Sequence, residues 1–169
     1  MKSPFGRVEM EVGPHYQDKL SDLIRAEKPE FVIETGLYKG LGAEYILEAL
    51  DDNNKGHLYS IDPTPHAGFI NNPIKHPRFT WVNDFSQKVL PSITEKIDFF
   101  VHDSDHGYDC QTFEYEWAWN NVPSGGIIAT DDPWWGCPAH FAWSQFLARH
   151  GMNVKDAHII GNAMWVRRP

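Results

Sequence analysis

Residues 31–42 have the sequence FVIETGLYKGLG, in which a short apolar run leads into a glycine-rich segment. The β-branched and aromatic residues at the start of this stretch predict a buried strand over 31–35. Apolar side chains then recur at helical spacing, at Ala43, Ile46, Leu47 and Leu50. A strand, a glycine turn and a helix in immediate succession indicate an α/β fold built on a parallel sheet.

The rest of the chain continues this alternation of strands and helices. Further strands are expected at 57–62, 78–84, 97–103 and 127–132, and further helices at 15–27, 108–121 and 138–150. The helix over 108–121 would carry Cys110, Phe113 and Trp117 on one face. Four prolines between residues 63 and 77 leave room for at most a broken helix in that segment.

The C-terminal segments 156–160 and 163–168 flank Gly161-Asn162, a two-residue pair typical of an antiparallel hairpin. One strand should therefore run against the others. No repeat or linker divides the chain, so we predict a single domain over residues 1–169. Its sheet is expected to be mostly parallel and covered by helices on both faces.

The composition is that of a globular protein and argues against a nucleic-acid partner. Of the 169 residues, 41% are hydrophobic and 22% are charged, and the formal net charge is -8. No basic run long enough to grip a phosphate backbone is present. We therefore expect no nucleic-acid partner.

The N-terminal residues lack the apolar core of a signal peptide, and no stretch approaches the length that spans a bilayer. We therefore expect a cytoplasmic protein with no membrane partner. The two cysteines, Cys110 and Cys137, are too few for a disulfide framework and lack the spacing of a zinc site. The sequence does not set the oligomeric state, and a homo-oligomer stays open.

Acidic residues stand at the ends of the five expected parallel strands: Glu34, Asp62, Asp84, Asp103 and the pair Asp131-Asp132. Ligands of parallel α/β sheets bind beyond the carboxyl ends of the strands. Aspartate is also common in turns and helix caps, which would explain one or two of these acids. Five acidic ends at one edge favour a binding site.

The glycines of the opening stretch have the spacing G-x-x-x-G-x-G, at Gly36, Gly40 and Gly42. This is neither the dinucleotide-binding G-x-G-x-x-G pattern nor a Walker loop. Glycines at a strand-to-helix turn nevertheless let a ligand approach the backbone at the start of a helix. Asp62 ends the next strand, where such folds hold ribose hydroxyls, although a turn cap before Pro63 is the alternative.

Several segments taken together resemble the class I S-adenosylmethionine-dependent methyltransferases. These are FVIETGLYKGLG, YSID, WVNDFS, FFVHDSDHGYD and GGIIATDD, in this order. The acid-rich ends of the fourth and fifth strands are similar to those of the metal-dependent O-methyltransferases of the catechol and antibiotic-sugar types. The resemblance implies a Rossmann-like, doubly wound, mostly parallel seven-stranded sheet with a C-terminal antiparallel hairpin. It also implies S-adenosylmethionine and Mg²⁺, or another divalent cation, as cofactors.

The same resemblance assigns roles along the cofactor site. Glu34, Gly36 and Gly40 would line the methionine end, and Asp62 would hold the ribose. Asp84 would lie beside the adenine. Asp103 would lie at the junction of the cofactor and the metal.

For the reaction centre, the resemblance implies Asp103, Asp131 and Asp132 as metal ligands and His106 as the general base. Neighbouring parallel strands lie about 4.8 Å apart, so carboxylates from two adjacent strand ends can reach one ion. The metal would acidify and orient an acceptor hydroxyl, and an imidazole suits proton removal near neutral pH. The function implied is O-methylation of a small molecule such as a catechol, a sugar or another natural product.

Four further residues near this centre have less certain roles. Trp134 and Trp135 follow the double aspartate directly and are candidates for stacking on a substrate ring. His102 should point away from Asp103 because side chains alternate along a strand, which favours a packing role. Asp105 is expected to cap the next helix or to orient His106.

Three other functions compete with methyl transfer. A metal-dependent hydrolase would use the same His/Asp cluster, but the H-x-H-x-D-H pattern is missing. A protein of the same fold that binds the cofactor without catalysis is the second alternative. A nicotinamide oxidoreductase, the third, is disfavoured by the glycine spacing.

Overall fold

The computed structural model describes residues 16–134 and 138–169. Its strands are β1 (Phe31–Thr35), β2 (His57–Ile61), β3 (Phe79–Val82), β4 (Phe99–His102), β5 (Ile127–Asp131), β6 (His158–Ile160) and β7 (Ala163–Arg167). Its α-helices are α1 (Tyr16–Glu27), α2 (Leu41–Asp52), α3 (Ala67–Asn71), α4 (Ser86–Val89), α5 (Tyr108–Asn121) and α6 (Pro138–Arg149). None of the helices in these described ranges has the length and apolar character needed to cross a membrane.

The strands form one seven-stranded sheet in the order β3-β2-β1-β4-β5-β7-β6. The pairs from β3 to β5 are all parallel, whereas β7 runs antiparallel to both of its neighbours, β5 and β6. The strand order reverses between β1 and β4, which is the switch point where ligands of such sheets bind. The predicted doubly wound α/β fold with its C-terminal antiparallel hairpin is confirmed.

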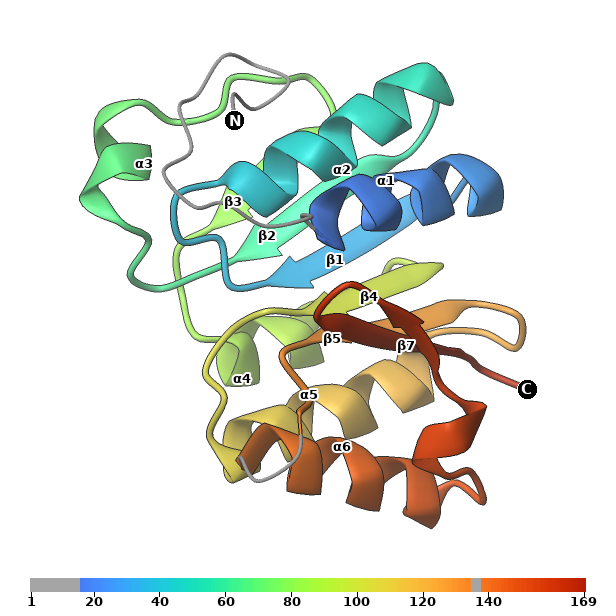
Figure 1. The fold of residues 1–169 in the computed structure, drawn as a ribbon. Coiled ribbons are helices and arrows are strands. Elements are labelled where there is room, and N and C mark those ends of the chain that lie inside the picture. Colours follow the sequence, from blue (N-terminus) through green and yellow to red (C-terminus); the bar gives the residue numbers. More distant parts are fainter. Residues whose placement is uncertain (1–15, 135–137) are drawn as a thin grey trace.

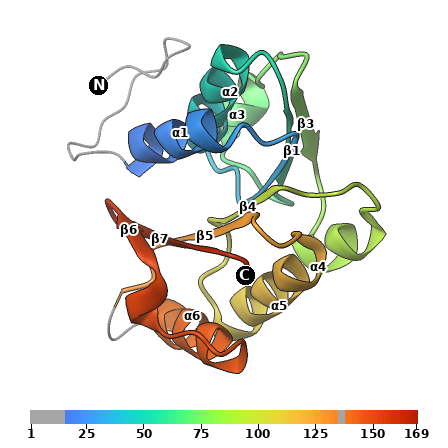
Figure 2. The same ribbon diagram turned by 90° about the vertical axis from the view of Figure 1, so that its right-hand side faces the viewer.

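Helices cover both faces of the sheet and create two separate cores. Helices α1, α2 and α3 lie on one face, and α4, α5 and α6 lie on the other (Figures 1 and 2). Alternate residues of the strands divide between them, so Val32 belongs to the α2 core and Ile33 to the α5 core. The central strands β1, β4 and β5 are buried over nearly their whole length. This burial on both faces agrees with their near-continuous apolar sequences.

Helix α5 buries a different face from its apolar one. Cys110, Phe113 and Trp117 do share a face, but all three stay partly exposed. The fully buried positions are Gln111, Glu114, Tyr115 and Ala118. The amide of Gln111 and the carboxylate of Glu114 can occupy this interior because both form hydrogen bonds to buried polar groups.

The C-terminal hairpin turns where the sequence predicts. Ile160 pairs with Ala163, so Gly161 and Asn162 form a two-residue turn. Gly161 has φ 63°, a left-handed conformation that suits glycine at the first central position of such a turn. Because Asp131 pairs with Ala163, this turn lies beside the carboxyl end of β5.

Candidate active site

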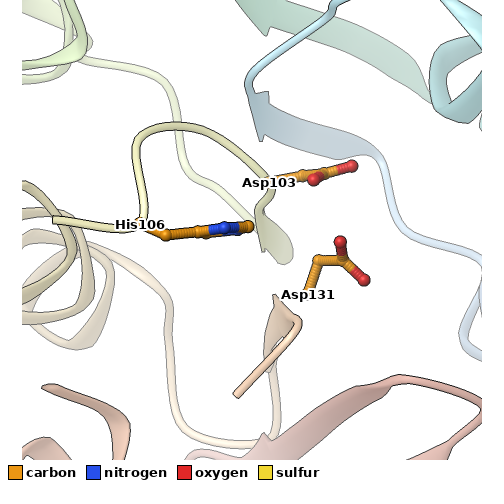
Figure 3. Close-up of side chains that lie close together, drawn as sticks. All are labelled: Asp103, His106 and Asp131. Atoms are coloured by element: carbon orange, nitrogen blue, oxygen red, sulfur yellow. The ribbon is translucent and has the colours of Figure 1, made fainter. Parts of the chain in front are cut away.

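Two aspartates and a histidine meet where β4 and β5 end. Asp103 follows β4, and Asp131 is the last residue of the neighbouring β5. His106 lies in the loop between β4 and α5, and its ring is directed toward the two carboxyl groups (Figure 3). One ligand atom from each of the three residues lies within 4.8 Å of the other two. Carboxylate oxygens and an imidazole nitrogen at this spacing can hold one divalent cation.

The environment of Asp131 supports that conclusion. The residue is 7% exposed, and burial together with the charges of Asp103 and Asp132 raises the pKa of its carboxyl group to about 8. Like charges this close disfavour ionisation unless a counter-charge is present. A bound cation would supply that charge, so the residues fit the metal that the resemblance implies.

His106 provides a neutral imidazole at the edge of this cluster. Burial lowers the pKa of His106, and the nearby His102 lowers it further, against the opposing effect of the acids. Its Nε2 atom is buried and has no hydrogen-bond partner among the described residues. The preceding Asp105 accepts a bond from the Gly107 N–H at 2.9 Å, where α5 begins. Asp105 therefore shapes the turn before α5, whereas the helix cap expected of it is not formed, because Gly107 is the N-cap residue and no side chain caps the helix.

Asp132 is oriented by the hairpin turn. The side-chain amide of Asn162 donates to Asp131 at 3.0 Å and to Asp132 at 2.8 Å, through Oδ1 of each acid. Asp132 itself has φ 47°, a left-handed conformation that is uncommon outside glycine. Asp132 is not a member of the three-residue group, but it lies next to it and adds to its negative charge.

The glycine loop lies at the same edge of the sheet, after β1. Gly36 and Gly40 have φ values of 86° and 83°, and Gly40 directly precedes α2. Asp62 accepts the backbone N–H groups of Leu37 and Tyr38 at 2.9 and 3.0 Å through one carboxylate oxygen. The acid after β2 therefore holds the loop after β1 in shape.

Glu34 lies near the end of β1, just before that loop. It is 3% exposed and accepts a bond from the Ser60 hydroxyl at 2.5 Å. Burial raises the pKa of Glu34 to about 8. A Cβ atom at Gly42 would lie 2.8 Å from Oε1 of Glu34, so a larger residue there would displace this carboxyl group.

Asp84 lies further along the edge, after β3. Its carboxylate pairs with Lys88 at 3.0 Å and accepts the Phe85 N–H at 2.8 Å, and the Lys88 bond holds the pKa of Asp84 below its ordinary value. Phe85 is 54% exposed and offers an open ring at this position.

A buried polar network connects the ends of β1 and β4. Glu114 of α5 accepts bonds from Thr35 at 2.6 Å, from His102 at 2.5 Å and from Ser104 at 3.0 Å. The other ring nitrogen of His102 contacts Gln111 at 3.0 Å. Burial favours the neutral acid, but these bonds outweigh it and hold the pKa of Glu114 below its ordinary value. His102 thus has the packing role that the alternation of side chains predicts.

An exposed aromatic side chain follows the acids of β5. Trp134 comes directly after Asp131, Asp132 and Pro133 and is 37% exposed, whereas Trp135 lies outside the described residues. An exposed indole at this position is suited to a ligand with a flat or apolar surface.

Sequence reasoning missed two residues of this region, Asn162 and Glu114. The sequence pattern predicts only a turn at Asn162, and its position beside the acids follows from the pairing of β7 with β5. Glu114 carries a charge, and a charged residue is expected at the surface. The buried His102 was the available indication that an acid must lie opposite.

Comparisons with known proteins agree with the fold and show the family. A family model described as a methyltransferase domain matches residues 33–133. A search of curated protein sequences finds no match. The fold is similar to that of cofactor-bound Rv0187 from MTB, with 17% identity, a TM-score of 0.71, and coverage of 95% of this chain and 83% of the other.

Two further solved structures are similar at the level of the fold. The O-methyltransferase from Bacillus cereus in complex with SAH has 14% identity and a TM-score of 0.70, with 95% of this chain and 84% of that chain covered. TomG from Streptomyces achromogenes, an O-methyltransferase involved in tomaymycin synthesis and solved with SAM, has 15% identity and a TM-score of 0.67. That alignment covers 96% of this chain and 84% of TomG.

Proposed function

This chain belongs to the methyltransferase-domain family, and on that premise we propose that it is an S-adenosylmethionine-dependent O-methyltransferase that uses a divalent cation. The observation that carries the proposal is the meeting of Asp103, His106 and Asp131 within 4.8 Å, at the sheet edge that also holds the glycine loop. The solved structures named above with SAH or SAM bound support the choice of methyl donor.

The cofactor would lie along the carboxyl ends of β1, β2 and β3. The backbone at Gly36 and Gly40 would approach its methionine end, and Glu34 would line the same end. Asp62 would hold the ribose while its bonds to the loop keep that loop in shape. Asp84 would lie beside the adenine, next to the exposed ring of Phe85. The cofactor supplies an activated methyl group.

Asp103, Asp131 and Asp132 would hold the cation, most simply Mg²⁺, because hard oxygen ligands suit it. When bound, the cation acts as a Lewis acid that lowers the pKa of a coordinated hydroxyl. Asp103 would contact both the cation and the cofactor region, because its main chain packs against Gly36. The three acids therefore orient the acceptor relative to the methyl donor.

His106 would accept the acceptor's proton. Its lowered pKa keeps the imidazole neutral near pH 7, and its buried Nε2 has no partner among the described residues. A base must lie within hydrogen-bond reach of the proton that it removes, and the proximity of His106 to Asp103 and Asp131 supports this role.

The acceptor would be a hydroxyl of a small molecule, such as a catechol, a sugar or another natural product. Trp134 follows the acids directly and would contact its ring or apolar face. We assign the same role to Trp135, which lies outside the described residues. TomG, which is similar in fold, is involved in tomaymycin synthesis, in keeping with a natural-product acceptor.

Calorimetry and a transfer assay test this function. S-adenosylhomocysteine should bind, and a panel of catechols and sugars should include an acceptor whose methylation needs Mg²⁺ and stops in excess EDTA. The double variant Asp131→Ala with Asp132→Ala should lose transfer while it retains affinity for S-adenosylhomocysteine. Asp51→Ala with Asp52→Ala removes an adjacent pair of exposed acids on α2 and is the matched control.

Each outcome separates one part of the proposal. Absence of binding at millimolar S-adenosylhomocysteine would overturn the methyltransferase itself. Full activity in EDTA would overturn the metal requirement alone. A pH–rate profile that is the same in His106→Gln would remove His106 as the base.

A further inference from the structure

The turn of the C-terminal hairpin reaches the acidic centre through a single residue. Asn162 is thirty residues away from the acids in sequence, but the antiparallel pairing of β7 with β5 sets Ala163 opposite Asp131. Asn162 therefore lies beside the end of β5, and it is partly buried. It does not belong to the ligand set or to the cofactor loop.

Asn162 makes three hydrogen bonds to two consecutive acids. Its amide nitrogen donates to Oδ1 of Asp131 at 3.0 Å and to Oδ1 of Asp132 at 2.8 Å. Its main-chain oxygen accepts the N–H of Asp132 at 3.1 Å. Only the amide NH₂ can face the two carboxylates, because the amide oxygen has no proton to donate. The orientation of this side chain is therefore set by its chemistry.

The strain in Asp132 indicates why such a contact is needed. A left-handed backbone costs a non-glycine residue about 1–2 kcal/mol, and Asp132 adopts it with φ 47°. Such conformations persist where the surrounding structure determines them, and they concentrate at functional sites. Asn162 bonds to both the main chain and the side chain of Asp132, so it holds the backbone and the carboxylate of this residue in place.

The donor at this position is neutral, which matters for a cation site. A lysine or arginine in its place would neutralise the acids and compete with a metal ion for their oxygens. An amide satisfies one oxygen of each acid and leaves their negative charge in place. Because both Asn162 bonds use Oδ1, they fix the rotation of each carboxylate without engaging Oδ2.

We infer that Asn162 is a positioning residue for the cation site, which orients Asp131 and Asp132 for metal binding through its side-chain amide. This inference rests on the proposed metal dependence. It adds a residue of the hairpin to the site, and it gives the antiparallel β6–β7 extension a part in holding the reaction centre. Partners that orient metal ligands typically change metal affinity about 10–100-fold when they are removed.

The test measures Mn²⁺ affinity directly, by electron paramagnetic resonance of the free ion in a titration. Asn162→Ala and the size-matched Asn162→Leu both remove the amide and keep the main-chain oxygen. Each should weaken Mn²⁺ binding about tenfold or more, with affinity for S-adenosylhomocysteine within about twofold of the wild type. Asn120→Ala is the matched control, because its amide bonds only to a main-chain oxygen of the exposed part of α5; it should leave Mn²⁺ affinity unchanged.

A second readout separates positioning from a general loss of stability. The Mn²⁺ concentration at half-maximal transfer should rise in both Asn162 variants, while the rate at saturating Mn²⁺ stays near that of the wild type. A purely structural role would lower the melting temperature without moving that concentration. Unchanged Mn²⁺ affinity in folded Asn162→Ala and Asn162→Leu would overturn this inference alone. Absence of Mn²⁺ binding to the wild type would overturn it together with the proposed metal dependence.

Discussion

Replacing Gly36 by alanine tests the close contact between the glycine loop, proposed to bind the cofactor, and Asp103, which follows β4. Gly36 has φ 86°, and a Cβ atom on it would lie 1.9 Å from the main-chain oxygen of Asp103. No side-chain rotation can relieve this overlap, because both atoms belong to the backbone or are fixed to it. The loop after β1 and the segment after β4 would have to move apart.

The matched control is Gly125→Ala. Gly125 has φ 88°, so alanine there meets the same backbone penalty, but no atom lies within 4 Å of its added Cβ. The left-handed backbone should cost each variant about 1–2 kcal/mol. Gly36→Ala should lose a further ~1–3 kcal/mol, the usual cost of overpacking. The total for Gly36→Ala is then about 2–5 kcal/mol.

Urea unfolding gives both free energies, and calorimetry with S-adenosylhomocysteine and Mn²⁺ gives the functional consequence. Gly36→Ala should weaken the binding of both ligands, because it displaces the loop and Asp103 together, whereas Gly125→Ala should affect neither. Equal destabilisation of the two variants would refute the reasoning. It would mean that the backbone at Asp103 yields without cost and that the contact does not define the site.

Three other predictions follow from buried or bonded acids. Asp131→Asn should stabilise the metal-free protein at pH 8. Because the pKa of Asp131 is raised to about 8, this carboxyl group favours the folded state fully below about pH 4, and that contribution is lost as the pH rises to about 8. In urea unfolding with EDTA, the free energy of unfolding should therefore fall less between these pH values in the variant than in the wild type. Glu114→Leu should lower the free energy of unfolding by about 3–5 kcal/mol because it leaves buried donors without their acceptor. Glu116→Leu, on the same helix, removes only partly exposed ion pairs with Arg149 and His150 and should lower it by less than about 1 kcal/mol in the same assay. Asp62→Ala should weaken S-adenosylhomocysteine binding about tenfold or more because it removes the carboxylate that accepts two charge-assisted bonds from the loop, and a calorimetric titration that gives the wild-type affinity would contradict this.

The fold could be predicted from the sequence because its signals are local. FVIET and IIATD are apolar runs bounded by turn residues, and both form strands at the expected positions. The hairpin turn at Gly161-Asn162 needs only two residues to be recognised. The ends of the strands were predicted less accurately. The strand expected over 78–84 covers only Phe79–Val82, because residue 78 lies in a turn and residue 84 in a bend.

The proximity of site residues could be predicted only where it follows from the order of the strands in the sheet. Asp103 and Asp131 end neighbouring parallel strands, so their proximity follows from the topology. The contact of Asn162 with the acids depends on the register of β7 against β5, which no local pattern encodes. Glu114 follows the same logic, since a carboxylate is buried only when several donors converge on it from distant segments.

The Glu114 network explains why the two halves of the site should behave as one. Its carboxylate bonds to Thr35, which precedes Gly36, and to His102 and Ser104, which flank Asp103. The Asp103 N–H donates to the Thr35 main-chain oxygen at 2.9 Å, so the ends of β1 and β4 are joined at the backbone as well. Methyl transfer requires the donor and the acceptor oxygen to be aligned closely, and misplacement by about 1 Å can cost a hundredfold in rate. Because the same buried acid fixes the loop proposed for the donor and the strand end proposed for the acceptor, their relative position depends on the core beneath them rather than on surface loops.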